Sequence, residues 1–174
     1  VSIMNLACGP CRELADYIGT CGKSEAVRAI CVDIDPDALT FAHSVFSAFE
    51  HKAVVSLMQE NLIKWCLGRV EHDFGPQDMI YSSGLMDYLD DNLFKAMVAR
   101  CHEQLKPGGV LMLGNFSPAN PIRMFMDHIL DWKLIHRSAD DLIRLHDDSP
   151  FKGHVTVISE AQGINLFSVA TRPA

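Results

Sequence analysis

Hydrophobic positions follow two patterns along this chain: short apolar runs, and longer stretches with an apolar residue every three or four positions. The first pattern predicts buried β-strands and the second predicts amphipathic helices. The expected strands are 2–7, 29–34, 53–58, 78–83, 109–115, 154–159 and 164–171. Because helical stretches separate most of these runs, we expect an α/β fold built on a largely parallel sheet with right-handed crossovers.

Local signals mark where the expected helices begin and end. One apolar stripe extends from Ala38 to Phe49, and a second extends from Phe94 to Leu105, with Asn92 as its N-cap and Lys-Pro-Gly-Gly at 106–109 as its stop. The last two strands differ from the others, because only residues 160–163 separate them. A connection this short predicts an antiparallel hairpin at the end of the sheet.

Two further helices are expected between the fifth and sixth strands. Asn120-Pro121 is typical of an N-cap followed by proline at the first helical position. Ser138 with Asp141 indicates a capping box for a short helix near 139–146. The apolar stripe of the first of these helices is Ile122, Met126, Ile129 and Leu130.

Size and charge narrow the class of protein. The 174 residues fit one domain, 1–174, and the formal net charge of −7 with no basic run gives little electrostatic support for nucleic-acid binding. No apolar run approaches the roughly 18 residues of a membrane span, and no signal peptide is visible. Of the six cysteines, Cys8 and Cys11 form a CxxC, but no second pair with zinc-like spacing follows. We therefore expect a cytoplasmic protein with reduced thiols that pack as small hydrophobes.

The beginning of the chain carries the clearest chemistry. A strand runs into a turn of small residues around Gly9, a helix follows, and a second strand ends in Asp33, 24 residues after Gly9. This is the pattern of the first β-α-β unit of a nucleotide-binding fold, in which the carboxylate accepts hydrogen bonds from both ribose hydroxyls. The plainer alternative is that Asp33 caps the next helix, a role that Asp35 can fill before Pro36. A dinucleotide is disfavoured, because the third glycine of its motif falls on Arg12.

With these residues in this order, the chain resembles class I S-adenosylmethionine-dependent methyltransferases over essentially its whole length. Their first motif, acidic-x-Gly-x-Gly-x-Gly, aligns with Asn5, Ala7, Gly9 and Cys11, so only the middle glycine is kept and the acid is replaced by an amide. The resemblance implies a three-layer, Rossmann-like fold whose seven-stranded sheet ends in an antiparallel hairpin. Since the chain enters its first strand directly after Val1, we also expect that a natural N-terminal segment precedes it.

A narrower resemblance is to a bacterial group named for biosynthesis of the extracellular factor 3-hydroxypalmitic acid methyl ester. It rests on Asn-Leu-Ala-Cys-Gly-Pro at 5–10, on 80–89, and on Asp131-Trp132-x-Leu134-Ile135-x-Arg137. The name of the group implies carboxyl O-methylation of a hydroxy fatty acid.

The resemblance implies a set of cofactor contacts. Ile34 would pack on adenine, unless it is an ordinary core residue, and Asn61 would bind the exocyclic amine, although it also fits as a helix N-cap. The implied contacts with S-adenosylmethionine are Asn5, Ala7, Cys8, Gly9, Asp33, Ile34, Asn61, Leu62, Ser82 and Ser83.

For the acceptor, the exit of the fourth strand lacks the Asn/Asp-Pro-Pro-Tyr/Phe signature of amide and nucleobase methylation. A carboxylate acceptor is ionised at neutral pH and needs no general base, but it needs a partner for its charge. Candidate partners and pocket walls are Tyr88, Arg123, His128, His136 and Arg137. The candidates for an acyl pocket are Met124, Phe125, Met126 and Trp132. For all of these residues, the plainer interpretation is an ordinary core or surface position. No metal is expected, although a metal-assisted variant would draw on Asp87, Asp90, Asp91, Asn92 and Asn115.

These observations favour a methyltransferase that acts on a small-molecule carboxylate or hydroxyl, such as a hydroxy fatty acid. A protein carboxyl methyltransferase is the main competing enzyme. Two other classes stay open: a catalytically weak methyltransferase-like module that works through partners, and an NAD-dependent oxidoreductase.

Overall fold

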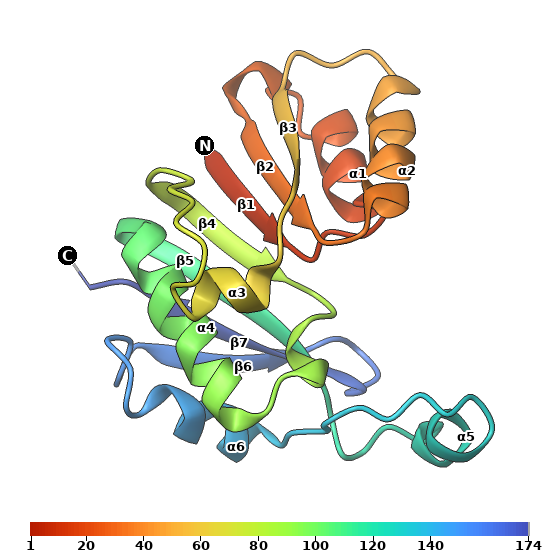
Figure 1. The fold of residues 1–174 in the computed structure, drawn as a ribbon, viewed down its shortest axis with the longest axis vertical. Helices are drawn as coiled ribbons and strands as arrows, with labels where there is room; N and C mark the ends of the chain where they lie inside the picture. The colour runs from red at the N-terminus through yellow and green to blue at the C-terminus, as the bar shows by residue number, and fades with distance from the viewer. Residues whose placement is uncertain (174) are drawn as a thin grey trace.

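The computed structural model describes residues 1–173 and places them around one sheet (Figure 1). Along the chain the elements are β1 (Ser2–Leu6), α1 (Arg12–Thr20), η1 (Ser24–Ala26), β2 (Arg28–Asp33), α2 (Pro36–Ser47), β3 (Val54–Gln59), α3 (Leu62–Cys66), β4 (Gln77–Ser82), η2 (Met86–Tyr88), α4 (Asp91–Gln104), β5 (Leu105–Phe116), α5 (Arg123–His128), α6 (Ala139–His146), β6 (Val155–Ser159) and β7 (Asn165–Thr171), where η marks a 3-10 helix.

The sheet has seven strands in the order β3-β2-β1-β4-β5-β7-β6. Neighbouring strands among β1 to β5 pair in parallel, whereas β7 is antiparallel to both β5 and β6. The expected seven-stranded, mostly parallel sheet with a terminal hairpin is therefore confirmed. The chain direction places the carboxyl ends of β1, β2 and β4 at the same edge of the sheet, which is where open α/β sheets bind ligands.

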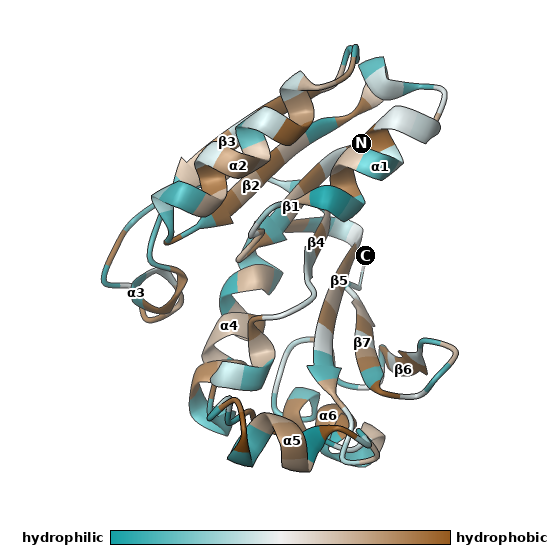
Figure 2. Ribbon diagram, turned by 90° about the vertical axis from the view of Figure 1, so that its right-hand side faces the viewer, coloured by the Kyte–Doolittle hydropathy of each residue, from teal (hydrophilic) through white to brown (hydrophobic). Residues whose placement is uncertain are grey.

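Two apolar cores, one on each face of the sheet, make this a three-layer fold. One core packs α1 and α2 on β1 and β2 through residues such as Leu14, Ala42 and Cys31. The other packs α3, α4 and α6 on the opposite face, with Trp65 and Phe94 fully buried. In Figure 2 the strands between the helices are mostly hydrophobic, and the helices carry polar residues on their outer sides.

Side-chain caps fix several helix starts where the sequence places them. Asp35 accepts a hydrogen bond from the Asp37 N–H (2.9 Å) at the start of α2, and Ser138 with Asp141 forms the expected capping box of α6. The predicted start of α4 was wrong by two residues. The Asp90 carboxylate, and not Asn92, accepts the capping hydrogen bond from the Leu93 N–H (2.9 Å). Aspartate and asparagine are equally good caps, so local chemistry alone does not choose between them.

The segment around α5 departs furthest from its prediction. The helix begins at Arg123, and Asn120 instead accepts the Ile122 N–H (3.1 Å) in a turn before it. Only Met126 of the expected apolar stripe is buried, because the helix ends at His128 and leaves Ile129 70% exposed. Figure 1 shows α5 set apart from the three layers, which fits the exposure of its other apolar residues, Met124 and Phe125.

Within residues 1–173, no helix is both long and apolar enough to cross a membrane. All six cysteines are free, and five of them are buried, as expected of thiols that pack as small hydrophobes. Cys31 and Cys101 lie in the two cores.

Candidate cofactor and acceptor site

The loop between β1 and α1 has an unusual backbone. Ala7, Gly9 and Cys11 all have positive φ (51°, 50° and 55°), although only one of them is glycine. The loop is held by a hydrogen bond from the Cys8 N–H to the Val32 carbonyl (3.0 Å). Such a tight loop of small residues leaves its backbone open to a ligand at the carboxyl edge of the sheet.

Asp33 joins this loop to the end of β2. Its Oδ2 accepts the Gly9 N–H at 2.8 Å, and its Oδ1 accepts the Asp35 N–H at 3.0 Å. The carboxylate is 8% exposed. It does not cap α2, since Asp35 does so. A carboxylate offers about four lone-pair positions, so these two bonds leave capacity for two further donors.

A cavity of about 110 Å³ opens beside Asp33 and brings together residues from the ends of four strands, β1 to β4. Its lining is Ala7, Asp33, Ile34, Glu60, Asn61, Leu62, Ile63 and Leu85. Ile34 is 59% exposed, which excludes the alternative that it is a core residue. A larger hollow of about 980 Å³ lies between the end of α2 and β3, around His43 and His51, but none of the expected cofactor residues lines it.

Asn61 lines this cavity and also caps a helix. Its Oδ1 accepts the Lys64 N–H (3.0 Å) at the start of α3, which confirms the capping role. Its own N–H donates to Glu60 Oε1 at 2.7 Å, and Glu60 also lies 3.3 Å from His72 Nδ1. Because the cap occupies the amide oxygen, the Asn61 side-chain NH2 stays available to a ligand acceptor.

Asn5, which replaces the acid of the first motif, is 1% exposed and does not line the cavity. Its Nδ2 donates to Glu13 Oε1 (3.0 Å) and to Cys11 Sγ (3.3 Å). Glu13 also accepts a hydrogen bond from the Tyr81 hydroxyl at 3.0 Å. The pKa of Tyr81 is raised, first by burial and then by the nearby Glu13 charge, so Tyr81 stays a donor. A carboxylate therefore lies beside the first motif, but it comes from α1.

The end of β4 presents one serine to the interior and one to the surface. Ser82 is fully buried, and its hydroxyl has no hydrogen-bond partner among residues 1–173. Ser83 is exposed. A buried polar group without a partner is uncommon in folded proteins, and it is one feature of this edge that a bound ligand would explain.

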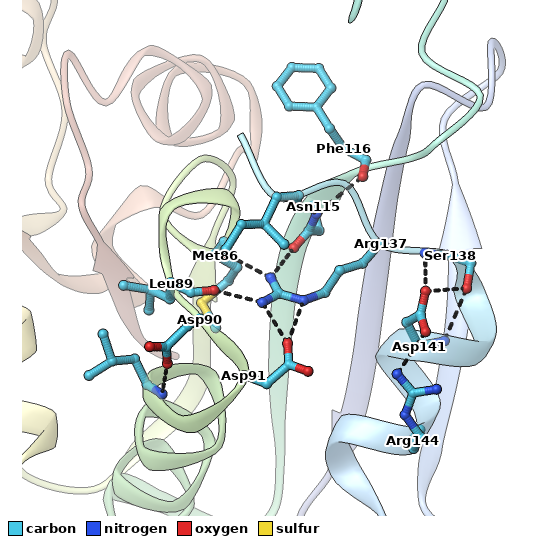
Figure 3. A network of polar contacts seen from close by, with 12 residues as sticks. Met86, Leu89, Asp90, Asp91, Asn115, Phe116, Arg137, Ser138, Asp141 and Arg144 are labelled. Atoms are coloured by element: carbon cyan, nitrogen blue, oxygen red, sulfur yellow. Dashed lines mark hydrogen bonds and ion pairs between the residues drawn. The ribbon is translucent and has the colours of Figure 1, made fainter. Parts of the chain in front are cut away.

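The structure removes Arg137 from the expected acceptor site (Figure 3). Its guanidinium, 3% exposed, donates to the Met86 and Leu89 carbonyls (2.9 and 2.6 Å), to Asn115 Oδ1 (2.9 Å) and to Asp91 Oδ1 (2.9 and 3.3 Å). It also lies over the Phe94 ring, 5.1 Å from the centroid. All five N–H groups are engaged, so none remains for a substrate carboxylate. Arg137 instead ties the segment after β5 to η2 and α4.

The residues that a metal-assisted variant would draw on also make contacts within the protein. Asp87 is buried and accepts the Phe116 N–H at 2.7 Å, and burial raises the pKa of its carboxyl. Asp90 caps α4, Asp91 pairs with Arg137, and Asn115 contacts Arg137 and the Ile135 carbonyl (2.8 Å). Within residues 1–173, no three His, Cys, Asp or Glu side chains are grouped as a metal site would require.

Tyr88 and the residues around α5 form the exposed part of the expected acceptor site. The Trp132 Nε1–H donates to the Tyr88 hydroxyl at 2.7 Å, although 88 and 132 belong to separate segments. The side chains around them are open to solvent: Tyr88 56%, Ile122 55%, Met124 67%, Phe125 52%, Ile129 70%, Leu130 54% and Trp132 42%. We call these seven residues the α5 lobe. They form an exposed surface, whereas Met126, expected in the same pocket, is buried.

The cationic candidates near the α5 lobe are not directed at one point. Arg123, 47% exposed at its side chain, lies 3.4 Å from Asp127 on the same helix. His136 Nδ1 lies 3.1 Å from the Leu134 carbonyl, and His128 is exposed. Of these, Arg123 keeps free donors at the surface.

A family model described as a methyltransferase domain matches residues 3–109. This is more than half of the chain and contains the first-motif loop, Asp33, Asn61 and the end of β4. The chain belongs to this methyltransferase domain family. No relative is found among curated protein sequences.

Solved structures share the fold of this methyltransferase domain at low sequence identity. A possible exported protein from Bordetella parapertussis is 20% identical, with a TM-score of 0.74 over 99% of this chain and 62% of its own. An O-methyltransferase family protein from Burkholderia thailandensis is 15% identical (TM-score 0.76; 99% and 51%). A SAM-dependent methyltransferase from Methanosarcina mazei is 17% identical (TM-score 0.67; 99% and 92%). The chain thus spans about half to three fifths of the first two of these proteins.

Part of the site was not found from the sequence. The cavity brings together five of the ten expected cofactor residues, namely Ala7, Asp33, Ile34, Asn61 and Leu62. Leu85, Ile63 and Glu13 were not predicted. No motif marks them, since their places depend on how β4, α3 and α1 meet the loop. The available signal was an acidic residue, Glu13, in the first turn of the first helix.

Proposed function

We propose that this methyltransferase domain binds S-adenosylmethionine at the carboxyl ends of β1, β2 and β4 and methylates a small-molecule carboxylate or hydroxyl. When bound, this cofactor supplies an electrophilic methyl group on a sulfonium. The observation that carries the proposal is the cavity in which the Asp33 carboxylate, the exposed Ile34 and the free amide of Asn61 lie together.

Each of these groups suits one part of an adenosine. The two unused lone-pair positions of Asp33 suit the vicinal ribose hydroxyls, in charge-assisted hydrogen bonds. The apolar side chain of Ile34 suits an adenine face, and the Asn61 NH2 suits a ring nitrogen, since its oxygen is held by the Lys64 N–H. This last role replaces the expected contact with the exocyclic amine, because two donors do not bind each other.

Farther along the edge, the groups suit the amino-acid part of the cofactor. The Glu13 carboxylate, beside Asn5 and Tyr81, is proposed as the partner of the ammonium that the first-motif acid usually serves. The unpartnered Ser82 hydroxyl and the exposed Ser83 are proposed as polar contacts near the carboxylate. Together they fix the sulfonium relative to the acceptor, and good alignment can contribute about 7–11 kcal/mol to such a displacement.

On the acceptor side, we propose that the α5 lobe holds an apolar chain and that Arg123 and Tyr88 meet its polar end. The Tyr88 oxygen accepts from Trp132, so its own O–H remains free to donate. A carboxylate in this position needs no general base, since it is already ionised at neutral pH. These features support a hydroxy fatty acid as the acceptor class to test first.

One observation favours a second candidate, a methyltransferase-like module without activity. Asn5 carries no charge, and its amide is occupied by Cys11 and Glu13. If Glu13 does not serve the ammonium, cofactor affinity will be low, and the domain will act through partners instead.

Calorimetric titration of S-adenosylhomocysteine into wild type, Asp33→Asn and Asp37→Asn separates the two candidates. Asp37 is exposed on α2, and its side chain has no hydrogen bond to the loop, so it is the matched control. We expect micromolar binding by wild type and Asp37→Asn and a loss of at least about 100-fold in Asp33→Asn, since two charge-assisted hydrogen bonds weaken. No binding by the wild type in its longest natural form would favour the interaction module. Where binding is seen, transfer of labelled methyl to 3-hydroxy fatty acids tests the acceptor.

A further inference from the structure

Three thiols lie together beneath the loop that shapes the proposed cofactor site. Cys8 and Cys11 belong to the loop, and Cys31 lies on β2, behind it. The sulfur atoms of Cys11 and Cys31 are 3.4 Å apart. Both residues are fully buried, and Cys8 is 6% exposed. The separation is short enough for a disulfide to form with a small movement of the backbone.

The surroundings distinguish Cys11 from its neighbours. Cys11 is the N-cap residue of α1, and helix N-termini favour a thiolate. The contacts of Cys11 with the thiols of Cys31 and Cys8, and a hydrogen bond that its sulfur accepts from the Asn5 amide at 3.3 Å, hold the pKa of Cys11 well below its usual range. The same contact with Cys11 raises the pKa of Cys31.

These contacts give a physical meaning to two departures from the first motif. The amide at position 5 donates a hydrogen bond to the sulfur, whereas the usual carboxylate would repel a thiolate there. The cysteine at position 11, where the motif has glycine, supplies that sulfur. The loop beside the proposed cofactor site is thus built around a sulfur whose surroundings favour the thiolate form, and the proposed methyl transfer does not use this sulfur.

We propose that Cys11 and Cys31 form a reversible disulfide that lowers the affinity of the domain for its cofactor. Hydrogen peroxide is a sufficient oxidant. The Cys11 thiolate attacks one peroxide oxygen, the O–O bond breaks, and hydroxide leaves and is protonated to water, which gives a sulfenic acid. The Cys31 sulfur then attacks the Cys11 sulfur, the S–O bond breaks, and the departing oxygen leaves as water with the proton of Cys31. Two thiols lose two electrons, and the peroxide becomes two waters.

The predicted effect on the site follows from distances. A disulfide brings the two sulfur atoms from 3.4 Å to about 2.05 Å. Residue 11 then moves toward β2, while Gly9, two residues earlier, must keep its 2.8 Å hydrogen bond to Asp33. A misplacement of about 1 Å can cost about 100-fold in rate through lost orientation, and we expect the same movement of this loop to weaken cofactor binding by about tenfold. This consequence rests on the proposed cofactor function, whereas the disulfide does not.

The test begins with peptide mapping of the whole chain. Protein is treated with hydrogen peroxide, free thiols are alkylated, and linked peptides are identified by mass spectrometry, before and after reduction with dithiothreitol. We expect a Cys11–Cys31 linked peptide in wild type and in Cys66→Ala, a matched control outside the cluster, and none in Cys31→Ala. Cys11→Ala serves the same purpose if Cys31→Ala does not fold. Absence of the linked peptide from wild type, or oxidation confined to the partly exposed Cys21, overturns the proposal.

Titration of S-adenosylhomocysteine then tests the coupling. We expect oxidised wild type to bind about tenfold or more weakly than reduced protein, with full recovery after dithiothreitol, and Cys31→Ala to be insensitive to peroxide. A linked peptide with unchanged affinity overturns the coupling. If reduced wild type binds no S-adenosylhomocysteine, the proposed function fails and the coupling fails with it, while the mapping still decides whether the disulfide forms.

Discussion

The two ends of the proposed reaction site use their polar groups in opposite ways. At the cofactor end, Asp33 and Asn61 satisfy the backbone with part of their hydrogen-bonding capacity and keep the rest beside a cavity. At the acceptor end, Arg137 donates all of its N–H groups to the protein, and what faces solvent is the apolar α5 lobe.

The difference shows how a charged residue near a site is best judged. Arg137 and Asp33 are similarly buried, at 3% and 8% exposed. The number of unused donors and acceptors, and not burial or charge, separates a binding group from a structural one. By this measure the proposed cofactor end keeps unused hydrogen-bonding groups beside a cavity, and the proposed acceptor end is an open apolar surface.

The largest effect is expected from Arg137→Met. The change leaves the Met86 and Leu89 carbonyls and Asn115 Oδ1 without their buried donor, so we expect a loss of about 3–5 kcal/mol in the free energy of unfolding, measured with urea. Arg123→Met, at an exposed position, is the control and should change stability by less than about 0.5 kcal/mol. If Arg137→Met is as stable as wild type but binds the acceptor poorly, the comparison between the two ends is wrong.

A second effect comes from His146, the last residue of α6, whose side chain is buried beside Ser168 (Nε2 to Oγ, 3.2 Å). Burial lowers the pKa of His146 to about 4. Since the unfolded chain takes up this proton near pH 6.5, the stability is complete above that pH and is lost as the pH falls from 6.5 toward 4. We expect His146 to account for up to about 2 kcal/mol of the loss between pH 6.5 and 5.

Urea midpoints at these two pH values check this, with His146→Gln against the exposed His43→Gln. The His146 variant should lose less stability on acidification than wild type, whereas the His43 variant should follow wild type. Equal pH dependence in all three proteins would show that folding does not lower the pKa of His146.

A third and smaller effect separates the two roles of Asn61. Asn61→Ala removes the cap of α3 and should cost about 1 kcal/mol of stability. Ser138→Ala removes the cap of α6, away from the cavity, at a similar cost. If Asn61 also contacts the cofactor, only its variant loses affinity for S-adenosylhomocysteine by calorimetry. Equal affinity in both variants would leave Asn61 as a cap alone.

The smallest effect on stability is expected in the α5 lobe. Phe125→Ser and Ile129→Ser change side chains that are 52% and 70% exposed. Each should therefore change the free energy of unfolding, measured by thermal denaturation, by less than about 0.5 kcal/mol. If the lobe holds an apolar chain, the KM for long-chain 3-hydroxy fatty acids rises while kcat stays the same. A marked loss of stability would show instead that the lobe packs against something in the folded protein.

The fold was largely predictable, because strands and helices are set by local periodicity and capping. The seven strands were found to within four residues at each end, with the start of β5 as the largest difference, and the capping box of α6 was placed correctly. Asp33 and Asn61 were proposed from their positions after β2 and β3, and both line the cavity. The prediction that failed, a substrate-binding role for Arg137, depended on tertiary contacts. Arg137 and Arg123 are both arginines in one segment, and only the folded chain shows that every N–H group of Arg137 is already hydrogen-bonded. The Cys11–Cys31 contact was hidden for the same reason, since the residues are 20 positions apart in the sequence.

We expect adenosine to bind across the Asp33 cavity and the open edge beside it, and a crystal structure of the reduced protein with S-adenosylhomocysteine will show whether it does. We expect both ribose hydroxyls to bind the Asp33 carboxylate, adenine to lie against Ile34 and accept a hydrogen bond from Asn61, and the ammonium to lie near Glu13. Ligand density in the hollow around His43 and His51, or a ribose that does not touch Asp33, would contradict it.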